Sequence, residues 1–143
     1  DIAQAAAQQL RETGINCTVE IPAQMDWGGQ MACLIGWGSP FDADDHTYKV
    51  FGTDKGANYS SYSNEKVDEY LSLARQSDDP EVRKEYYGKF QEELAEDPAY
   101  AFICYIDANY VADSGIQGIS KDTVLGHHGV GIFWNIQDWT MTE

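Results

Sequence analysis

The sequence predicts an α/β fold in which helices flank a mixed sheet. Residues 31–37 and 101–106 contain no charged side chain, which is typical of strands that are covered on both faces. Three segments with the spacing of amphipathic helices begin near residues 2, 64 and 80. This order of helices and strands favours a layered arrangement in one domain, and 143 residues are enough to form its core.

The N-terminal part is predicted to be a helix followed by a strand. Residues 2–13 place Ile2 and Leu10 on one face, and Gly14 follows where a helix commonly ends. Residues 16–21 alternate between polar and apolar side chains, which is the pattern of a half-covered strand. The helix and the strand supply the first members of the two layers.

The middle of the chain is predicted to hold an ordered loop and then a helix. Residues 47–62 follow no regular period, so we expect a long loop there. Ser63 or Asn64 can cap the helix that follows. Its apolar stripe consists of Val67, Tyr70, Leu71 and Ala74.

A second helix is predicted directly afterwards. Asp79 is placed to cap it, and Pro80 suits its first turn. Its buried stripe is expected to consist of Val82, Tyr86, Phe90 and Leu94. The charged residues expected to face solvent are Arg83, Lys84, Glu85, Lys89 and Glu92.

The last third of the chain is predicted to add strands and an irregular tail. Residues 101–106 form a second buried strand in this interpretation, and residues 110–112 continue or pair with it. From residue 114 onward glycines recur, and residues 130–139 are apolar and aromatic without a clean period. We therefore expect irregular or short-strand structure there.

Composition excludes several classes of partner. Nine Lys and Arg against 24 Asp and Glu give a net charge of −15, which repels phosphate backbones and anionic membranes. We expect no nucleic-acid partner. No apolar run reaches the length of a membrane span. The chain opens with neither Met nor a secretory signal, so we expect it to be part of a longer protein.

The three cysteines are Cys17, Cys33 and Cys104. They are widely spaced and form no Cys-x-x-Cys pair, so the sequence does not favour a zinc knuckle or a dithiol redox centre. Free cysteine commonly behaves as a small buried apolar residue. We expect all three in the core.

The candidate binding site lies at the carboxyl end of the strand predicted at residues 31–37, because ligands of open α/β sheets bind at such ends. Aromatic surfaces, an irregular backbone and polar groups meet there. The candidate residues are Trp37, Gly38, Pro40, Phe41, Asp42 and His46. Taken singly, Phe41 is expected in the core, and the sequence leaves Trp37 open between core and ligand contact.

Four residues after this strand have side chains that ligate metals. They are Asp42, Asp44, Asp45 and His46. Their spacing resembles the opening of a calcium loop, but Thr47 and Thr53 stand where an EF-hand needs Gly and Glu, which excludes that motif. For at least two of the four, we expect capping of turn amides or of a helix N-terminus.

Metal binding by histidine and hydrolysis by carboxylates stay open from the sequence. The candidate metal ligands are His46, His127 and His128, although adjacent residues on an extended chain point to opposite faces. No serine-hydrolase, metalloprotease or phosphate-loop motif is present. A hydrolase domain that uses Asp42, Asp45 and His46 is the alternative to a binding protein. We expect binding rather than catalysis, and no cofactor.

Five segments in their order resemble the C-terminal portion of family 5 extracellular solute-binding proteins, the peptide and nickel class that serves ABC importers. The segments are residues 9–16, 36–38, 58–68, 83–87 and 97–98. Each is loosely similar, but the ordered set is fairly specific, and the resemblance covers nearly the whole chain.

The resemblance implies one lobe of a periplasmic-binding-protein-like fold of type II, cluster C. Residues 1–125 would form the C-terminal ligand-binding lobe, and residues 126–143 a tail that returns toward an N-terminal lobe outside this sequence. The ligand, a small molecule or a peptide, would be captured between the lobes and delivered to an ABC permease. The protein would act in the periplasm or, lipid-anchored, at the extracellular face of the cell membrane.

The resemblance also bears on the ligand. Pro40 stands where peptide-binding relatives hold the peptide amino group with an Asp, whereas nickel-chelate relatives resemble residues 37–42 more closely. Phe41 and Ala43 replace a Tyr and a Pro of those relatives. Asp42 would then be a candidate partner for an ammonium group of the ligand. The sequence leaves open whether the solute is a peptide or a metal chelate.

Overall fold

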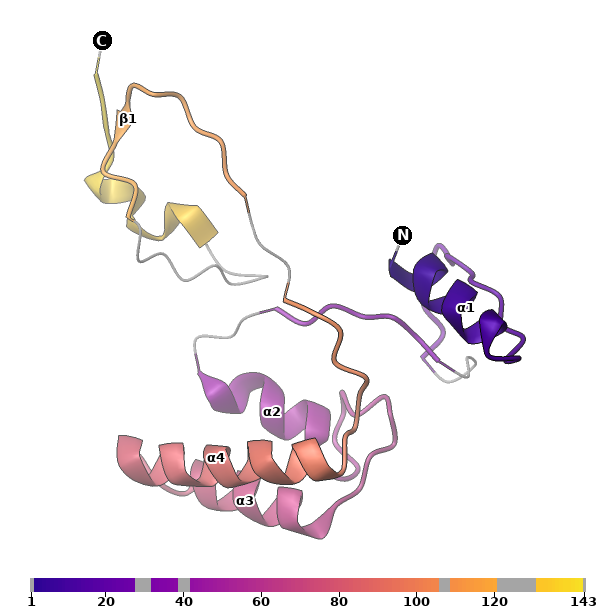
Figure 1. The fold of residues 1–143 in the computed structure, drawn as a ribbon. Coiled ribbons are helices and arrows are strands. Elements are labelled where there is room, and N and C mark those ends of the chain that lie inside the picture. The colour runs from indigo at the N-terminus through magenta and orange to yellow at the C-terminus, as the bar shows by residue number, and fades with distance from the viewer. Residues whose placement is uncertain (1, 28–31, 39–41, 106–108, 121–130, 143) are drawn as a thin grey trace. The chain divides into compact units, whose positions relative to one another are not determined.

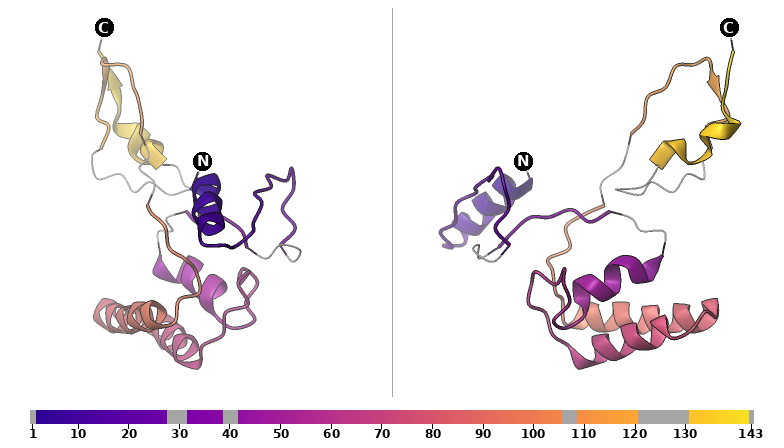
Figure 2. Two further views of the ribbon diagram at one scale, coloured as in Figure 1. Left: turned by 45° about the vertical axis from the view of Figure 1, so that its right-hand side comes forward. Right: turned by 180° about the vertical axis from the view of Figure 1, so that it is seen from behind.

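The computed structural model describes residues 2–27, 32–38, 42–105, 109–120 and 131–142 (Figures 1 and 2). Its helices are α1 (Ile2–Glu12), α2 (Ala43–Phe51), α3 (Glu65–Arg75) and α4 (Pro80–Glu96), with a 3₁₀ segment η1 (Gly131–Asp138). Strands β1 (Ile116–Gln117) and β2 (Thr140–Met141) pair antiparallel. The chain divides into two compact units, Asp1–Gly36 and Trp37–Glu143.

The first unit is built on α1 and confirms the helix predicted at residues 2–13. Gly14 has a φ of 92°, a conformation that glycine adopts without strain, and its N–H donates to the carbonyl of Arg11 at 3.0 Å. The chain then folds back on the helix. Arg11 Nη1 donates to the carbonyl of Cys17 at 2.9 Å, and Cys17 Sγ lies 3.5 Å from the carbonyl oxygen of Ala7.

The predicted mixed sheet is wrong for the described residues. Residues 16–21, 32–37 and 101–105 form no strand, and the pair β1–β2 makes up the sheet that the described residues contain. Leu34 is 52% exposed and Tyr105 is fully exposed. A strand forms only where a neighbour supplies hydrogen-bond partners, and apolar composition alone does not provide one.

The prediction that the cysteines lie in the core is wrong for Cys33 and Cys104, which are exposed, and Cys17 is only partly buried. None of the three forms a disulfide. Residues 110–112 likewise form no strand. The reason is shared: these residues lie on segments that pack into no sheet among the described residues.

The long loop predicted at residues 47–62 is also wrong in its first part, because α2 extends to Phe51. Asp42 has an extended backbone, and its carboxylate accepts the N–H of Asp44 at 2.7 Å, which caps the helix. The helix ends at Gly52, whose N–H donates to a carbonyl of its last turn. The sequence did not reveal α2, because the helix is only nine residues long and its first turn contains Asp44, Asp45 and His46, which have low helix propensity.

Helices α3 and α4 confirm the predicted starts. Asn64 caps α3 and accepts the N–H groups of Lys66 and Val67 at 3.0 and 3.2 Å. Asp79 caps α4 and accepts the N–H of Glu81 at 2.9 Å, with proline as the first helical residue. Both caps satisfy amide groups that a helix N-terminus otherwise leaves without a partner.

The core of the second unit lies between α3 and α4, which run side by side in all three views, with α2 beside them (Figures 1 and 2). Its buried residues are Val67, Leu71, Phe90 and Leu94. Asn64, at the start of α3, donates to Asp97, at the end of α4, at 2.9 Å, so the two helices are antiparallel. The predicted stripe of α4 is confirmed at its C-terminal half, while Val82 and Tyr86 are half-buried.

The described part of the tail confirms irregular and short-strand structure. Asn135 is buried and interrupts η1 with a non-helical backbone. Its Nδ2 donates to the carbonyl of Gly118 at 2.8 Å, and its Oδ1 accepts from Trp139 Nε1 at 3.1 Å. One side chain thereby ties η1 to the residue after β1 and to the residue before β2, at one end of the β1–β2 pair. No helix among the described residues is long and apolar enough to cross a membrane.

Leu71→Ala should lower the free energy of unfolding by about 2–5 kcal/mol, because Leu71 is fully buried between α3 and α4 and the change leaves a cavity. Urea denaturation followed by circular dichroism measures the effect. Leu10→Ala on α1 is the matched control: Leu10 is 42% exposed, so its loss should be less than about 1 kcal/mol. Equal losses in the two variants would contradict this location of the core.

Candidate functional site

Three ring side chains from separate segments meet in the second unit: Trp37, His46 on α2, and Tyr59 in the loop after α2. The ring centroids of Trp37 and His46 are 5.6 Å apart, with the planes at 50°. Those of Trp37 and Tyr59 are 6.2 Å apart, with the planes only 6° from parallel. Trp37 is 40% exposed and Tyr59 is 39% exposed, so both offer accessible ring surface. We call these three residues the aromatic cluster.

The aromatic cluster contains two of the candidates that the sequence proposed. Trp37 is open to solvent rather than in the core, and His46 lies beside it. Tyr59 was missed, because it stands among polar residues in a loop and has no periodicity to mark it. One signal could have found Tyr59: it lies in residues 58–68, one of the five segments that resemble the solute-binding family.

His46 is held in the cluster by α2 and carries a polar atom that has no hydrogen-bond partner among the described residues. Its Nδ1 is shielded from solvent and makes no hydrogen bond to any described residue. Buried polar atoms of folded proteins are nearly always hydrogen-bonded. The atom therefore calls for a partner, such as a group of a bound solute, a water molecule or another part of the protein.

Asp42 has two structural contacts that fix the start of α2. Besides capping the helix, both of its oxygens accept from Nη2 of Arg83 on α4, at 2.8 and 3.0 Å. The hydrogen bond from the N–H of Asp44 is the main cause that lowers the pKa of the Asp42 carboxyl from its ordinary value of 3.8. The hydrogen bond and positive charge of Arg83 lower this pKa further. The solvent position predicted for Arg83 is therefore wrong: its side chain is 24% exposed and lies against this carboxylate.

The two carboxylates that follow are also paired with cations. Asp44 lies 3.1 Å from Nε of Arg75 on α3, and the guanidinium of Arg75 lies 3.8 Å from the ring centroid of Tyr48. Asp45 lies 3.0 Å from Nζ of Lys49, one turn along α2. Asp44 and Asp45 occupy the first turn, where negative charge favours the helix. Among the described residues, Asp42 is the one of the four whose side chain accepts a helix N–H, so the capping predicted for at least two of them is confirmed for one.

Asn58 organises the loop that carries Tyr59. Its Nδ2 donates to the carbonyls of Gly52 and Tyr62 at 2.9 and 2.7 Å. Its Oδ1 accepts the N–H of Tyr62 at 3.0 Å and the hydroxyl of Ser60 at 3.2 Å. One half-buried amide thus closes the loop on both sides of Tyr59 and fixes the backbone that carries this aromatic side chain.

The other candidates are placed only in part. Gly38 is half-buried beside Trp37. The remaining ones lie outside the described residues: Pro40, Phe41, His127 and His128. In the part of the chain that the structure describes, no three His, Cys, Asp or Glu side chains are grouped so that they could hold a metal ion.

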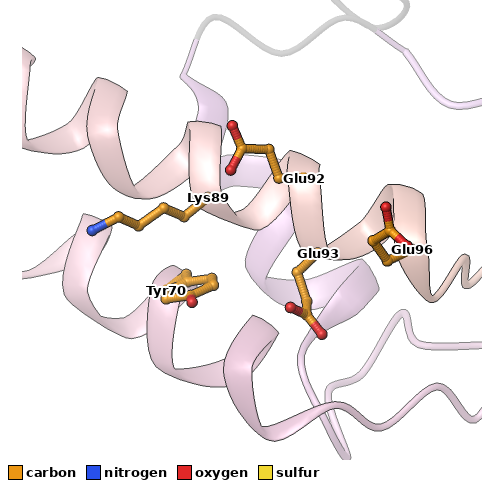
Figure 3. A pocket seen from close by; sticks show the side chains of 5 residues that line it. All are labelled: Tyr70, Lys89, Glu92, Glu93 and Glu96. Atoms are coloured by element: carbon orange, nitrogen blue, oxygen red, sulfur yellow. The ribbon is translucent and has the colours of Figure 1, made fainter.

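A surface depression lies elsewhere, on α3 and α4, with a volume of about 370 Å³. Its lining residues are Tyr70, Lys89, Glu92, Glu93 and Glu96 (Figure 3). Lys66 Nζ is 2.9 Å from Glu93, and Lys89 Nζ is 2.6 Å from Glu85, so lysines offset part of its negative charge. It shares no residue with the aromatic cluster, and we regard it as a solvated depression between two helices.

Comparison with known proteins shows that the fold of this chain is that of part of a periplasmic binding protein. No family model matches the sequence. NikZ from Campylobacter jejuni, crystallised in complex with Ni(L-His), matches 97% of this chain with a TM-score of 0.75 and 35% identity. Protein XP55 of Streptomyces lividans is 32% identical over 127 residues, which is 84% of this chain. The chain spans 30% of the NikZ chain and 23% of Protein XP55.

Asp42→Asn should make the protein less stable than the wild type at pH 7, and the difference should vanish as the pH falls. Asparagine keeps the cap acceptor but loses the charge that Arg83 binds. Because the folded-state pKa of Asp42 is lowered, its contribution is complete above the unfolded value, near 3.8, and is lost as the pH falls through the folded value. Thermal unfolding between pH 3 and pH 7 measures this.

The matched control for that experiment is Asp78→Asn, which changes an exposed carboxylate that makes no ion pair among the described residues. It should leave the pH profile of the unfolding temperature close to that of the wild type. Profiles of wild type and Asp42→Asn that stay parallel from pH 7 to pH 3 would show that the ion pair with Arg83 does not stabilise the fold.

Proposed function

We propose that this protein is the substrate-binding component of an ABC importer, which captures a small extracellular solute and delivers it to a permease. The observation that carries the proposal is the likeness to NikZ over 97% of the chain, at 35% identity and a TM-score of 0.75. Because NikZ is crystallised with Ni(L-His), we propose a nickel or other metal chelate as the solute. An oligopeptide is the other solute that the sequence resemblance implies.

Within this proposal, the solute contacts Trp37 and His46, with Gly38, Pro40, Phe41 and Asp42 around it. Direct contact is supported by the exposure of Trp37 and by His46 Nδ1, which has no hydrogen-bond partner in the described part of the chain. The Asp42 side chain is 61% exposed despite its ion pair, so it remains accessible to a cationic group of the solute. His46, His127 and His128 are the proposed contributors of imidazole to a chelated metal.

The proposed mechanism is closure of two lobes around the solute. Residues 1–125 would contribute one lobe and residues 126–143 would return toward the other, which fits a chain that spans 30% of NikZ. Solute contacts made to both lobes stabilise the closed state, and the permease recognises that state. The protein would do this in the periplasm or at the outer face of the membrane, held there by a lipid anchor.

The alternative of a hydrolase that uses Asp42, Asp45 and His46 has less support. Asp42 and Asp45 are both engaged with cations, Arg83 and Lys49. A carboxyl that acts as general acid needs a raised pKa, whereas the pKa of Asp42 is lowered. We therefore propose binding rather than hydrolysis as the task of this site.

Native mass spectrometry with metal analysis of the purified protein should show one small adduct that carries one equivalent of nickel or another transition metal. A ladder of peptide masses would instead establish an oligopeptide receptor. Release of a hydrolysed product from an added solute would contradict the binding proposal and support the carboxylate hydrolase.

Trp37→Ala should weaken solute binding about tenfold or more without unfolding the protein, since aromatic anchors in binding sites commonly contribute roughly 2 kcal/mol. Trp37 is 40% exposed, so its truncation leaves no core cavity. Isothermal titration calorimetry measures the affinity, and circular dichroism measures the fold. Trp134→Ala, at another exposed tryptophan, is the matched control. Equal affinities of the Trp37→Ala variant and the wild type would exclude Trp37 from the site.

A further inference from the structure

We propose that Tyr59 forms a second wall of the solute site beside Trp37, and that the two side chains select solutes that carry a flat conjugated ring. We further assign Asn58 as the positioning residue that holds Tyr59 in place. This inference rests on the proposed solute-binding function and deepens it, because it names the chemical group that the site selects.

The rings of Trp37 and Tyr59 lie nearly parallel and close together. Parallel aromatic rings prefer offset arrangements with centroids about 4.5–7 Å apart. At 6.2 Å and 6°, the Trp37 and Tyr59 rings lie toward the distant end of that range, so they overlap only in part. Each side chain remains about 40% exposed. Together they present extended π surface of one orientation to solvent.

The carboxylates on the first turn of α2, those of Asp42, Asp44 and Asp45, are each paired with a cation, which offsets their charge. Ring faces therefore dominate what the aromatic cluster offers a solute. A flat conjugated ring gains stacking contact with such faces in addition to the burial of apolar area, whereas an aliphatic group of similar size gains only the burial.

The loop around Tyr59 is held in place by hydrogen bonds. Asn58 fixes the loop through its four hydrogen bonds to Gly52, Tyr62 and Ser60. The N–H of Ala57 donates to the carbonyl of Lys49 at 3.1 Å, which joins the loop to α2. Tyr59 and His46 are thereby held by one continuous frame.

An ordered frame of this kind favours recognition. A side chain that is already in place loses little conformational freedom when a solute binds, so more of the contact energy appears as affinity. Asn58 is assigned a positioning role for this reason: its amide contacts backbone and a hydroxyl, and it acts on the solute through Tyr59. An imidazole ring, as carried by a histidine chelate, is a flat ring of suitable kind.

The test compares two nickel chelates that differ by a ring. Isothermal titration calorimetry on the purified protein, expressed from its complete reading frame, uses Ni(II) with L-histidine and Ni(II) with glycine. The wild type should bind the histidine chelate more tightly. Tyr59→Leu should lower the affinity for the histidine chelate about tenfold and leave that for the glycine chelate within about twofold. Tyr59→Phe, which keeps the ring, is the matched control and should bind both chelates as the wild type does.

The role of Asn58 is tested in a double-mutant cycle. Asn58→Ala should reduce the preference for the histidine chelate in the wild type but cause no further loss of preference in Tyr59→Leu, because the two residues act through the same ring. A merely structural Asn58 would weaken both chelates equally in both backgrounds, and that result would overturn the positioning role.

Two other results separate the inference from the proposed function. If the wild type binds both chelates and Tyr59→Leu keeps the wild-type preference, or if Tyr59→Phe loses as much as Tyr59→Leu, the ring role of Tyr59 is overturned and solute binding stands. If the wild type binds neither chelate, the proposed metal-chelate function fails, and the inference fails with it.

Discussion

The apolar contact between α3 and α4 is the constraint on which the second unit depends. Val67 and Leu71 of α3 pack against Phe90 and Leu94 of α4. Helix α2 packs against the same two helices: the ring centroids of Phe51 on α2 and Phe90 on α4 are 5.4 Å apart. Helix α2 carries His46 and leads into the loop of Tyr59. The contact between α3 and α4 therefore also fixes the positions of these two rings.

Electrostatics refine the position that packing defines. The chain has only nine Lys and Arg against 24 Asp and Glu, yet Arg75 and Arg83 both bind carboxylates at the start of α2. One comes from α3 and the other from α4, so α2 is held against both helices. Exposed ion pairs stabilise proteins only weakly. Their larger effect is to fix the orientation of the helix and to offset the charge beside the aromatic cluster.

The local features of the fold were predictable, whereas the pairing of segments was not. Helix caps and helix ends depend on a few neighbouring residues, so sequence patterns reveal them. Examples are the caps at Asn64 and Asp79 and the end of α1 at Gly14. Buried strands at residues 31–37 and 101–106 were inferred from apolar composition. A strand, however, exists only through a partner that is distant along the chain. Helix α2 was missed because it is only nine residues long and its first turn contains residues with low helix propensity.

The sequence by itself determined the acidic character of the chain, the helices α3 and α4, and the choice of Trp37 and His46 as candidate site residues. These follow from composition and short-range spacing. The tertiary structure decided that their rings lie next to each other and that Tyr59 joins them. It also decided that Asp42, besides its local role as a cap, pairs with Arg83 of α4. The contacts of Trp37 with Tyr59 and of Asp42 with Arg83 join residues 22 and 41 positions apart, and only the packed core of α3 and α4 brings these segments together.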